Sequence, residues 1–420
     1  MRLLNTTTLN FKEFLGDHVP PYAILSHTWR ENEVTFQDLL TGPAKKMAKF
    51  AKLQRFCALA KDHQLDYAWM DTCCIDKTSS AELSEAINSM YRWYQMSAVC
   101  YAYLEDVHDG DDPTKEESDF RQSRWFSRGW TLQELIAPSC IYFCSANWKI
   151  LGSKLESDQT HEDVYRRRQL PILIVPDFRN LLSTITGISL GVLYNRRKLK
   201  DCSVAKRMSW AASRQTTRPE DIAYCLMGIF DVNMPLIYGE GEKKAFNRLQ
   251  EEILRVIEDD TLLMHICPES NCYHAYHPPL ASSPKGFRGL GAVEMGDKGP
   301  LFHGRNIPPQ MMPNGLRVQL PICTCEFEDG PLQQRQNAYI AILDCSIPGS
   351  YLDRGVIVLS KLRNGAFARH ANSVIARLEF EKQEVVLGTK DLTTIKKGMK
   401  MTFLKKIQLW IRVRMILTYL

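Results

Sequence analysis

Polar and aromatic side chains that can do chemistry follow the ends of short apolar runs in the first third of the sequence. Ser26, His27 and Trp29 close one such run, and Asp71 follows the later run Asp66–Met70. In an open parallel sheet, ligands bind outside the carboxyl ends of the strands. If these runs are parallel strands, their polar ends meet at one edge of the sheet. We therefore expect Ser26, His27, Trp29 and Asp71 to bind a substrate there.

A second group of candidate residues precedes the apolar run that begins at Cys140. Helical spacing puts Trp130 and Glu134 on one face, four residues apart. An aromatic ring, a carboxylate and basic groups would suit a flat heteroaromatic ligand that carries phosphates. The candidates here are Arg124, Arg128, Trp130 and Glu134. The alternative is that Trp29, Trp69, Trp125 and Trp130 fill the core and that Glu134 pairs with an arginine at the surface.

A cysteine hydrolase is a further alternative. Cys73 or Cys74 would be the nucleophile, His27 the base and Asp71 the residue that orients it. Buried cysteines are usually packing residues, and no glycine elbow surrounds Cys73. We therefore favour the packing interpretation.

Histidines and cysteines are densest just after residue 264. The set is His265, Cys267, Cys272, His274 and His277. Zinc requires about four such ligands in a tetrahedral array, but this spacing is cramped and unlike a standard finger. We expect no metal here, and bound zinc that is lost in Cys272→Ser would contradict that expectation.

Composition indicates an ordinary globular protein. Of the 420 residues, 45% are apolar and 24% charged, and the net charge is +5. That excess is too small to indicate nucleic-acid binding, and we expect the clusters Arg166–Arg168 and Arg196–Lys200 to be solvated faces. The 13 cysteines, without a secretory signal, predict reduced thiols and a cytoplasmic protein.

Periodicity divides the chain into three predicted parts. Residues 1–155 alternate strands and helices, which favours an α/β domain with a parallel sheet flanked by helices. Residues 156–262 are mostly helical, and residues 263–420 alternate with a period of two, which predicts a β-rich C-terminal domain. The segment Lys396–Leu420 fits either a final strand or a basic membrane-surface segment, and the pattern of Gln408–Met415 favours a strand.

The sequence resembles the fungal heterokaryon incompatibility (HET) domain over about the first 260 residues. The motifs that carry this resemblance include Pro21–Trp29, Trp69–Lys77, Glu85–Tyr94, Cys100–Asp106, Arg124–Pro138, Ala205–Trp210 and Pro235–Glu242. The resemblance implies a role in non-self recognition between fungal strains and in regulated cell death. Similar vegetative incompatibility proteins often carry a nucleotide-binding module and repeats after this region, and these 420 residues contain neither. The upstream sensor or incompatibility partner is therefore unspecified.

The order of the first motifs is also similar to that of Toll/interleukin-1 receptor (TIR) domains, which have a flavodoxin-like parallel sheet. In enzymatic TIR domains, the glutamate of a Trp-Cys-Leu-x-Glu-Leu block is required for NAD cleavage. Here the block reads Trp130-Thr-Leu-Gln-Glu-Leu135, with Thr131 in place of the cysteine. The resemblance implies Glu134 as the catalytic residue, NAD as a substrate and no resident cofactor.

The chemistry fits these residues. Cleavage of the nicotinamide–ribose bond passes through an oxocarbenium-like state, which one carboxylate can stabilise. We assign that role to Glu134, with Trp29 or Trp130 stacking on a ring and Arg124 or Arg128 meeting the pyrophosphate. We interpret the chain as an incompatibility effector that hydrolyses NAD. The alternative is a non-enzymatic module that triggers cell death by self-association through the HET domain or by recruiting partners.

Overall fold

The structure is a computed structural model. It describes residues 1–16, 18–41, 50–155, 175–267, 277–296, 308–313, 315–324, 338–346, 353–362, 366–369, 374–379, 384–387, 399–402 and 412–418. The chain divides into two compact units. Unit 1 consists of Met1–Lys198 and Arg214–Ile237, and unit 2 consists of Leu199–Ser213 and Tyr238–Leu420. The segment predicted as a helical extension, 156–262, contributes to both units, and the domain boundaries at 155 and 262 stay predictions.

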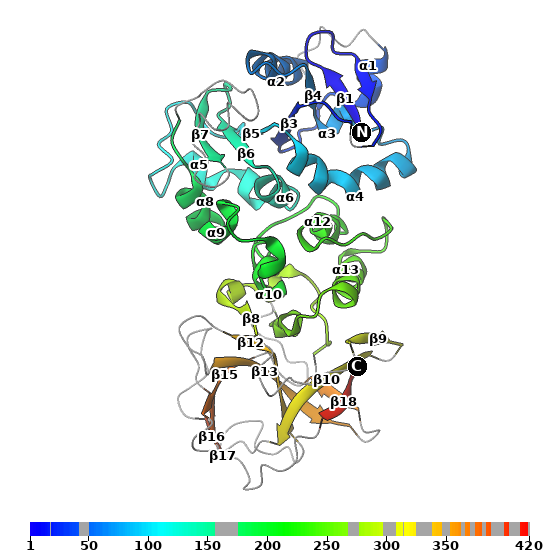
Figure 1. Cartoon of the computed structure of the whole chain (residues 1–420), viewed down its shortest axis with the longest axis vertical. Coiled ribbons are helices and arrows are strands. Elements are labelled where there is room, and N and C mark those ends of the chain that lie inside the picture. The colour runs from blue at the N-terminus through cyan, green and yellow to red at the C-terminus, as the bar shows by residue number, and fades with distance from the viewer. Residues whose placement is uncertain are drawn as a thin grey trace. The chain divides into compact units, whose positions relative to one another are not determined.

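Unit 1 is built around a mixed seven-stranded sheet with the order β2-β1-β4-β3-β5-β6-β7 (Figure 1). The strands are β1 (Arg2–Asn5), β2 (Phe11–Glu13), β3 (Tyr22–His27), β4 (Tyr67–Trp69), β5 (Val99–Tyr103), β6 (Cys140–Cys144) and β7 (Ile150–Leu155). The central strands β4, β3, β5 and β6 are parallel, whereas β1, β2 and β7 pair antiparallel. The predicted parallel sheet is therefore correct for the centre and wrong for the edges.

Short connections explain the antiparallel pairs β1–β2 and β6–β7. Residues 6–10 join β1 to β2, and residues 145–149 join β6 to β7. A parallel crossover needs a dozen or more residues, usually including a helix. The edge strands therefore fold back as hairpins.

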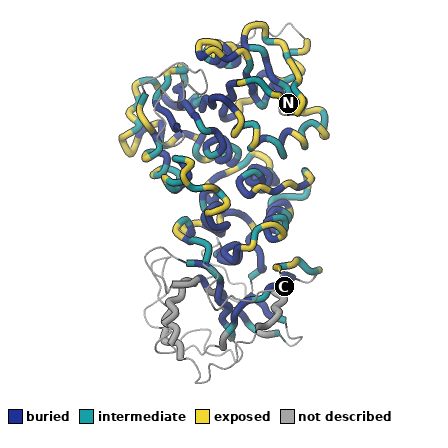
Figure 2. Tube along the Cα trace, viewed as in Figure 1, coloured by how far each residue is buried: buried dark blue, intermediate teal, exposed yellow. Residues whose placement is uncertain are grey.

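The central strands have the order 2-1-3-4 when numbered along the chain, which is the start of the flavodoxin-like order. All residues of β3 and β6 are buried (Figure 2). A sheet buried on both faces must be covered by helices. Helix α2 (Phe50–Asp62) packs on β3 and β4, and α6 (Thr131–Ile136) packs on β3 and on α4 (Ser80–Met96).

Helix α4 is the main amphipathic helix of unit 1. Ser79 caps it by accepting a hydrogen bond from the Glu82 backbone N–H at 3.3 Å. Its buried stripe ends at Tyr94, whose hydroxyl donates to the Leu25 carbonyl at 2.9 Å. Helix α12 (Met227–Phe230) packs closely on α4, since a Cβ at Gly228 would lie 2.1 Å from Tyr91 Cβ.

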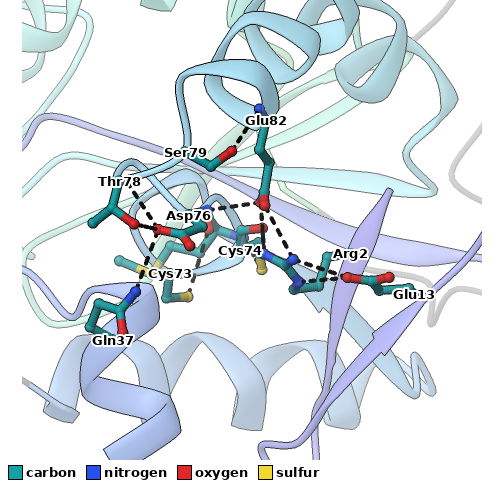
Figure 3. A network of polar contacts seen from close by, with 10 residues as sticks. Arg2, Glu13, Gln37, Cys73, Cys74, Asp76, Thr78, Ser79 and Glu82 are labelled. Atoms are coloured by element: carbon teal, nitrogen blue, oxygen red, sulfur yellow. Dashed lines mark hydrogen bonds and ion pairs between the residues drawn. The ribbon is translucent and has the colours of Figure 1, made fainter.

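A polar network ties the N-terminal strand to the start of α4 (Figure 3). The Arg2 guanidinium bonds to Glu82 at 2.7 Å and to Glu13 at 2.9 Å. Glu82 also accepts the Asp76 backbone N–H at 2.8 Å. This network fixes the loop after the short helix α3 (Asp71–Cys74).

Smaller helices complete unit 1. They are α1 (Phe36–Thr41), α5 (Asp119–Gln122), the 3-10 helix η2 (Arg124–Ser127), α8 (Arg179–Thr186), α9 (Leu190–Leu193) and α11 (Asp221–Tyr224).

Unit 2 combines short helices with a β-rich part. Its helices include α10 (Val204–Ser209), α13 (Glu242–Val256) and the 3-10 helix η4 (Asp260–Met264). A nine-stranded sheet is described, formed by β9 (Gln310–Met312), β10 (Gly315–Thr324), β11 (Ala338–Ile342), β13 (Asp353–Lys361), β14 (Phe367–Arg369), β15 (Val374–Glu379), β16 (Glu384–Leu387), β17 (Met399–Thr402) and β18 (Arg412–Thr418). Apart from the single parallel contact of β14 with β18, its described pairings are antiparallel. The predicted β-rich C-terminal region is confirmed.

The predicted final strand is also present, because β17 and β18 lie within Lys396–Leu420. Two short strands, β8 (Glu294–Met295) and β12 (Cys345–Ser346), form a separate pair. In the described part of the chain, no helix is long and apolar enough to cross a bilayer.

Candidate functional site

The carboxyl ends of β3 and β5 mark the point at which the sheet order reverses direction, where flavodoxin-like folds bind ligands. Ser26 and His27 are the last two residues of β3. Asp71 follows β4, and Glu105 follows β5. The edge of the sheet thus carries the polar residues expected from the sequence.

Glu134 reaches this edge from α6. Ser26 Oγ donates to Glu134 Oε2 at 2.5 Å and accepts the Trp125 indole N–H at 2.7 Å. Ser26, Trp125 and Glu134 are all buried. Trp125 and Trp69 fill the core, as the alternative interpretation predicted, but its expectation of a surface ion pair at Glu134 is wrong because that carboxyl is enclosed.

Burial controls the protonation of Glu134. It raises the pKa of this carboxyl to about 8, and the negative charge of Asp71 acts in the same direction. The hydrogen bond from Ser26, the neighbouring Tyr94 hydroxyl and the positive charge of Arg214 oppose that rise. Glu134 is therefore mostly neutral at pH 7 in the free protein.

Asp71 has the opposite character. Burial alone would raise the pKa of Asp71, but hydrogen bonds from His27 and Trp29 and the charge of Lys77 hold it below its ordinary value. His27 Nε2 lies 3.1 Å from Asp71 Oδ1, and the Trp29 indole N–H donates to Oδ2 at 2.8 Å. Two nearby carboxyl groups with separated pKa values are typical of sites that divide acid and base roles.

Trp29 gives the site an exposed aromatic surface. Its side chain is 53% exposed although its indole N–H is held by Asp71. The Lys77 ammonium lies 3.5 Å from the ring centroid, in a cation–π contact. A fixed and accessible indole is suited to stacking on a planar ring.

Two arginines converge on Glu105. Arg124 Nη2 lies 2.7 Å from Glu105 Oε1, and Arg30 Nε bonds to Oε2. The Glu105 side chain is only 4% exposed, whereas those of Arg30 and Arg124 are 63% and 60% exposed. The buried carboxylate holds two solvated guanidinium groups, which can also bind phosphate. Sequence reasoning missed Arg30, although it follows Trp29 directly.

Arg128 and Trp130 make different contacts. Arg128 Nη2 donates to Thr217 Oγ1 at 2.9 Å, and the Trp130 indole N–H donates to Asp221 Oδ2 at 3.1 Å. The structure therefore joins Ser26 to Glu134, joins His27 and Trp29 to Asp71, and links Arg124 to Glu105. The side chains of Arg128 and Trp130 instead contact the segment 214–237.

Of the cysteine alternative, the structure contains the contact between His27 and Asp71, but it does not favour the nucleophile. Cys73 and Cys74 are buried in α3. A hydrogen bond from Cys74 and burial raise the pKa of the Cys73 thiol well above its ordinary value, so a thiolate nucleophile is disfavoured.

Only some of the histidines and cysteines that were considered as metal ligands belong to the described part of the chain. Cys272 and His274 lie outside the described residues. His265 is buried, and its Nε2 lies 2.7 Å from Arg369 Nη1. Among the described residues, no group of three or more histidine, cysteine or acidic side chains is arranged to hold a metal ion.

Comparison with known proteins shows two similarities. Residues 22–119 match the family model "Heterokaryon incompatibility protein (HET)". The chain is also 45% identical over 249 residues to the vegetative incompatibility protein HET-E-1 of Podospora anserina. That alignment covers 58% of the present chain and 17% of the relative, so the chain spans only a small part of that protein's length. No solved structure matches the chain. Glu134 lies beyond the segment 22–119.

Proposed function

We propose that this chain is an effector of vegetative incompatibility and that unit 1 hydrolyses NAD at the nicotinamide–ribose bond. The HET-family match and the identity with HET-E-1 support the role in incompatibility. NAD depletion would connect this chemistry to cell death, with the cytoplasm as the compartment in which it acts.

The contact between Glu134 and Ser26 carries the enzymatic part of the proposal. It brings a carboxyl group from α6 to the carboxyl end of β3, beside the reversal of strand order. The central order 2-1-3-4 supports a TIR-like arrangement, in which a glutamate at this place cleaves NAD. Trp29 and the Glu105-held arginines supply groups that suit an aromatic dinucleotide.

In the proposed reaction, the C–N bond between ribose and nicotinamide breaks and its electron pair leaves with nicotinamide. Water adds to the ribose carbon, and one proton is released with ADP-ribose. Glu134 acts as a carboxylate that stabilises the positive charge developing on the ribose. Glu134 is mostly neutral at pH 7 in the free protein, and the cationic nicotinamide ring favours its ionisation when substrate binds.

In this proposal Trp29 stacks on a ring of the substrate, and Arg30 and Arg124 bind its diphosphate. Trp29 is preferred to Trp130 because its ring is exposed and held by Asp71. Arg124 is preferred to Arg128 because it shares Glu105 with Arg30 at the end of β5.

The test measures NAD loss with purified wild-type chain beside Glu134→Gln over a range of protein concentrations. Glu82→Gln is a matched control, because it also replaces a hydrogen-bonded glutamate of unit 1 by glutamine, but in the Arg2 network. Loss with wild type and Glu82→Gln but not with Glu134→Gln supports the proposal, and a steep concentration dependence supports self-association. No loss at any concentration, with all proteins folded, favours the non-enzymatic signalling module.

A further inference from the structure

Buried hydrogen bonds link Arg214 to Glu134 through Thr131, Trp125 and Ser26, and the covalent frame of Trp125 joins its backbone carbonyl to its indole. Arg214 Nη1 donates to Thr131 Oγ1 at 3.0 Å, and the Thr131 hydroxyl donates to the Trp125 carbonyl at 2.5 Å. From Trp125, the indole N–H reaches Ser26, which donates to Glu134. Each member of this path is buried.

Arg214 also anchors the approach to α6. The same Nη1 donates to the Arg128 carbonyl at 2.8 Å, just before the helix begins at Thr131. Arg214 is the first residue of the segment Arg214–Ile237, which rejoins unit 1 after residues 199–213. The side chain is 3% exposed, so its charge acts through a medium that screens poorly.

We propose that Arg214 is a positioning residue for Glu134. It holds the hydrogen-bonded contacts that orient the carboxyl group and supplies a positive charge that favours the ionised form of this group. Its kinetic consequence rests on the proposed NAD hydrolysis, whereas its electrostatic consequence does not.

The surroundings of Glu134 show why this charge matters. The ionisable or hydrogen-bonding groups that act on it come from β3, α3, α4, β5 and the rejoining segment, and they are Ser26, Asp71, Tyr94, Cys100 and Arg214. Asp71 disfavours the ionised form, whereas Arg214 favours it. Burial lowers the pKa of Arg214 to about 10, so it is still a cation at neutral pH.

Another buried cation provides a matched control at the far end of α6. Lys154 Nζ donates to the Pro138 carbonyl at 2.6 Å and to that of Ile136 at 3.4 Å. Its side chain is also almost fully enclosed, at 3% exposed. Lys154→Met should therefore loosen α6 much as Arg214→Met does, but it leaves the positive charge of Arg214 in place.

The experiment measures the pKa of Glu134 by carboxyl ¹³C NMR titration of the full chain, with the signal assigned by its loss in Glu134→Gln. Arg214→Met should raise this pKa by about 1 unit or more, and Lys154→Met should raise it clearly less. Arg214→Lys, which keeps the charge, should fall between wild type and Arg214→Met. If Arg214→Met does not fold, Arg214→Gln, which also removes the charge, replaces it in the comparison with Lys154→Met.

A rise in Arg214→Met no larger than that in Lys154→Met would overturn the inference. When NAD is cleaved, Arg214→Met should also move the alkaline rise of kcat to higher pH. If wild type cleaves no NAD but the pKa moves as expected, the proposed function fails and the coupling of Arg214 to Glu134 stands. If wild type cleaves NAD and the pKa of Glu134 is the same in Arg214→Met as in wild type, the inference about Arg214 fails and the proposed function stands.

Discussion

Ser26 at the end of β3 donates a hydrogen bond to Glu134 on α6, across 108 positions of the sequence. The contact encloses a carboxyl group beneath the edge of the sheet that carries Asp71, Trp29 and Glu105. It also places that carboxyl beside a second acid of opposite pKa shift. In the free protein this buried acid is mostly neutral and its neighbour is ionised, and the proposed chemistry requires the buried acid to ionise when substrate binds.

The stability of the chain should depend on pH through Glu134. The folded protein holds this proton more tightly, because the pKa rises from the ordinary 4.5 to about 8. The group therefore favours folding fully below pH 4.5, and its contribution is lost as the pH rises through about 8. The whole change is roughly 5 kcal/mol.

Glu134→Gln should remove that dependence, because the amide resembles the neutral acid. Thermal melting at pH 5 and pH 9 should show a smaller loss of Tm for the variant than for wild type. Equal losses in the two proteins would show that Glu134 does not carry a raised pKa.

Ser26→Ala should weaken the site and raise the pKa of Glu134 further. The change removes the hydroxyl that accepts the Trp125 indole N–H, which costs about 1–3 kcal/mol of unfolding free energy. The indole resonance of Trp125 should shift in ¹H–¹⁵N NMR spectra. Ser97→Ala, which removes the buried bond of Ser97 to the Tyr94 carbonyl, is the control and should leave that resonance in place.

Trp29→Ala should raise KM for NAD by about tenfold or more with little change in kcat, since a stacked base contributes about 1–3 kcal/mol. Trp29→Phe keeps a ring but loses the indole hydrogen bond to Asp71. Its KM for NAD should therefore lie between those of wild type and Trp29→Ala. Steady-state kinetics of nicotinamide release provide the measurement. An unchanged KM in Trp29→Ala would place the ring elsewhere.

Removing both Arg30 and Arg124 should weaken the binding of substrates that carry a diphosphate. The double change to glutamine should raise KM for NAD about tenfold or more and leave KM for nicotinamide riboside nearly unchanged. Arg55→Gln, at an exposed position of α2, is the control for loss of positive charge. Equal effects on both substrates would show that the Glu105-held arginines do not bind the diphosphate.

Much of the central sheet follows from local sequence. The apolar runs at 22–26, 66–70, 98–104 and 140–144 all predict strands that the structure contains, because fully buried strands read as continuous apolar segments. The edge strands β1 and β2 are short and partly exposed, so they carry no such run. The antiparallel direction of β2 against β1 depends on a short turn rather than on side-chain pattern.

Local sequence patterns do not predict the parts of the site that come from distant segments. Arg214 reaches α6 from 83 positions beyond Thr131, and its role depends on the path through Trp125. The burial of Glu134 likewise depends on how α6 packs on β3 and α4. A helical spacing of four from Trp130 predicts a shared face but does not predict that Trp130 bonds to Asp221.

The most direct test of the central claim is the rate of nicotinamide release from NAD at pH 7 and pH 8.5, with wild type, Glu134→Gln and Glu82→Gln at equal concentration. We predict release by wild type and Glu82→Gln, faster at pH 8.5 as Glu134 ionises. Release by Glu134→Gln should be at least about a hundredfold slower at both pH values. Equal rates for folded wild type and Glu134→Gln would contradict the account.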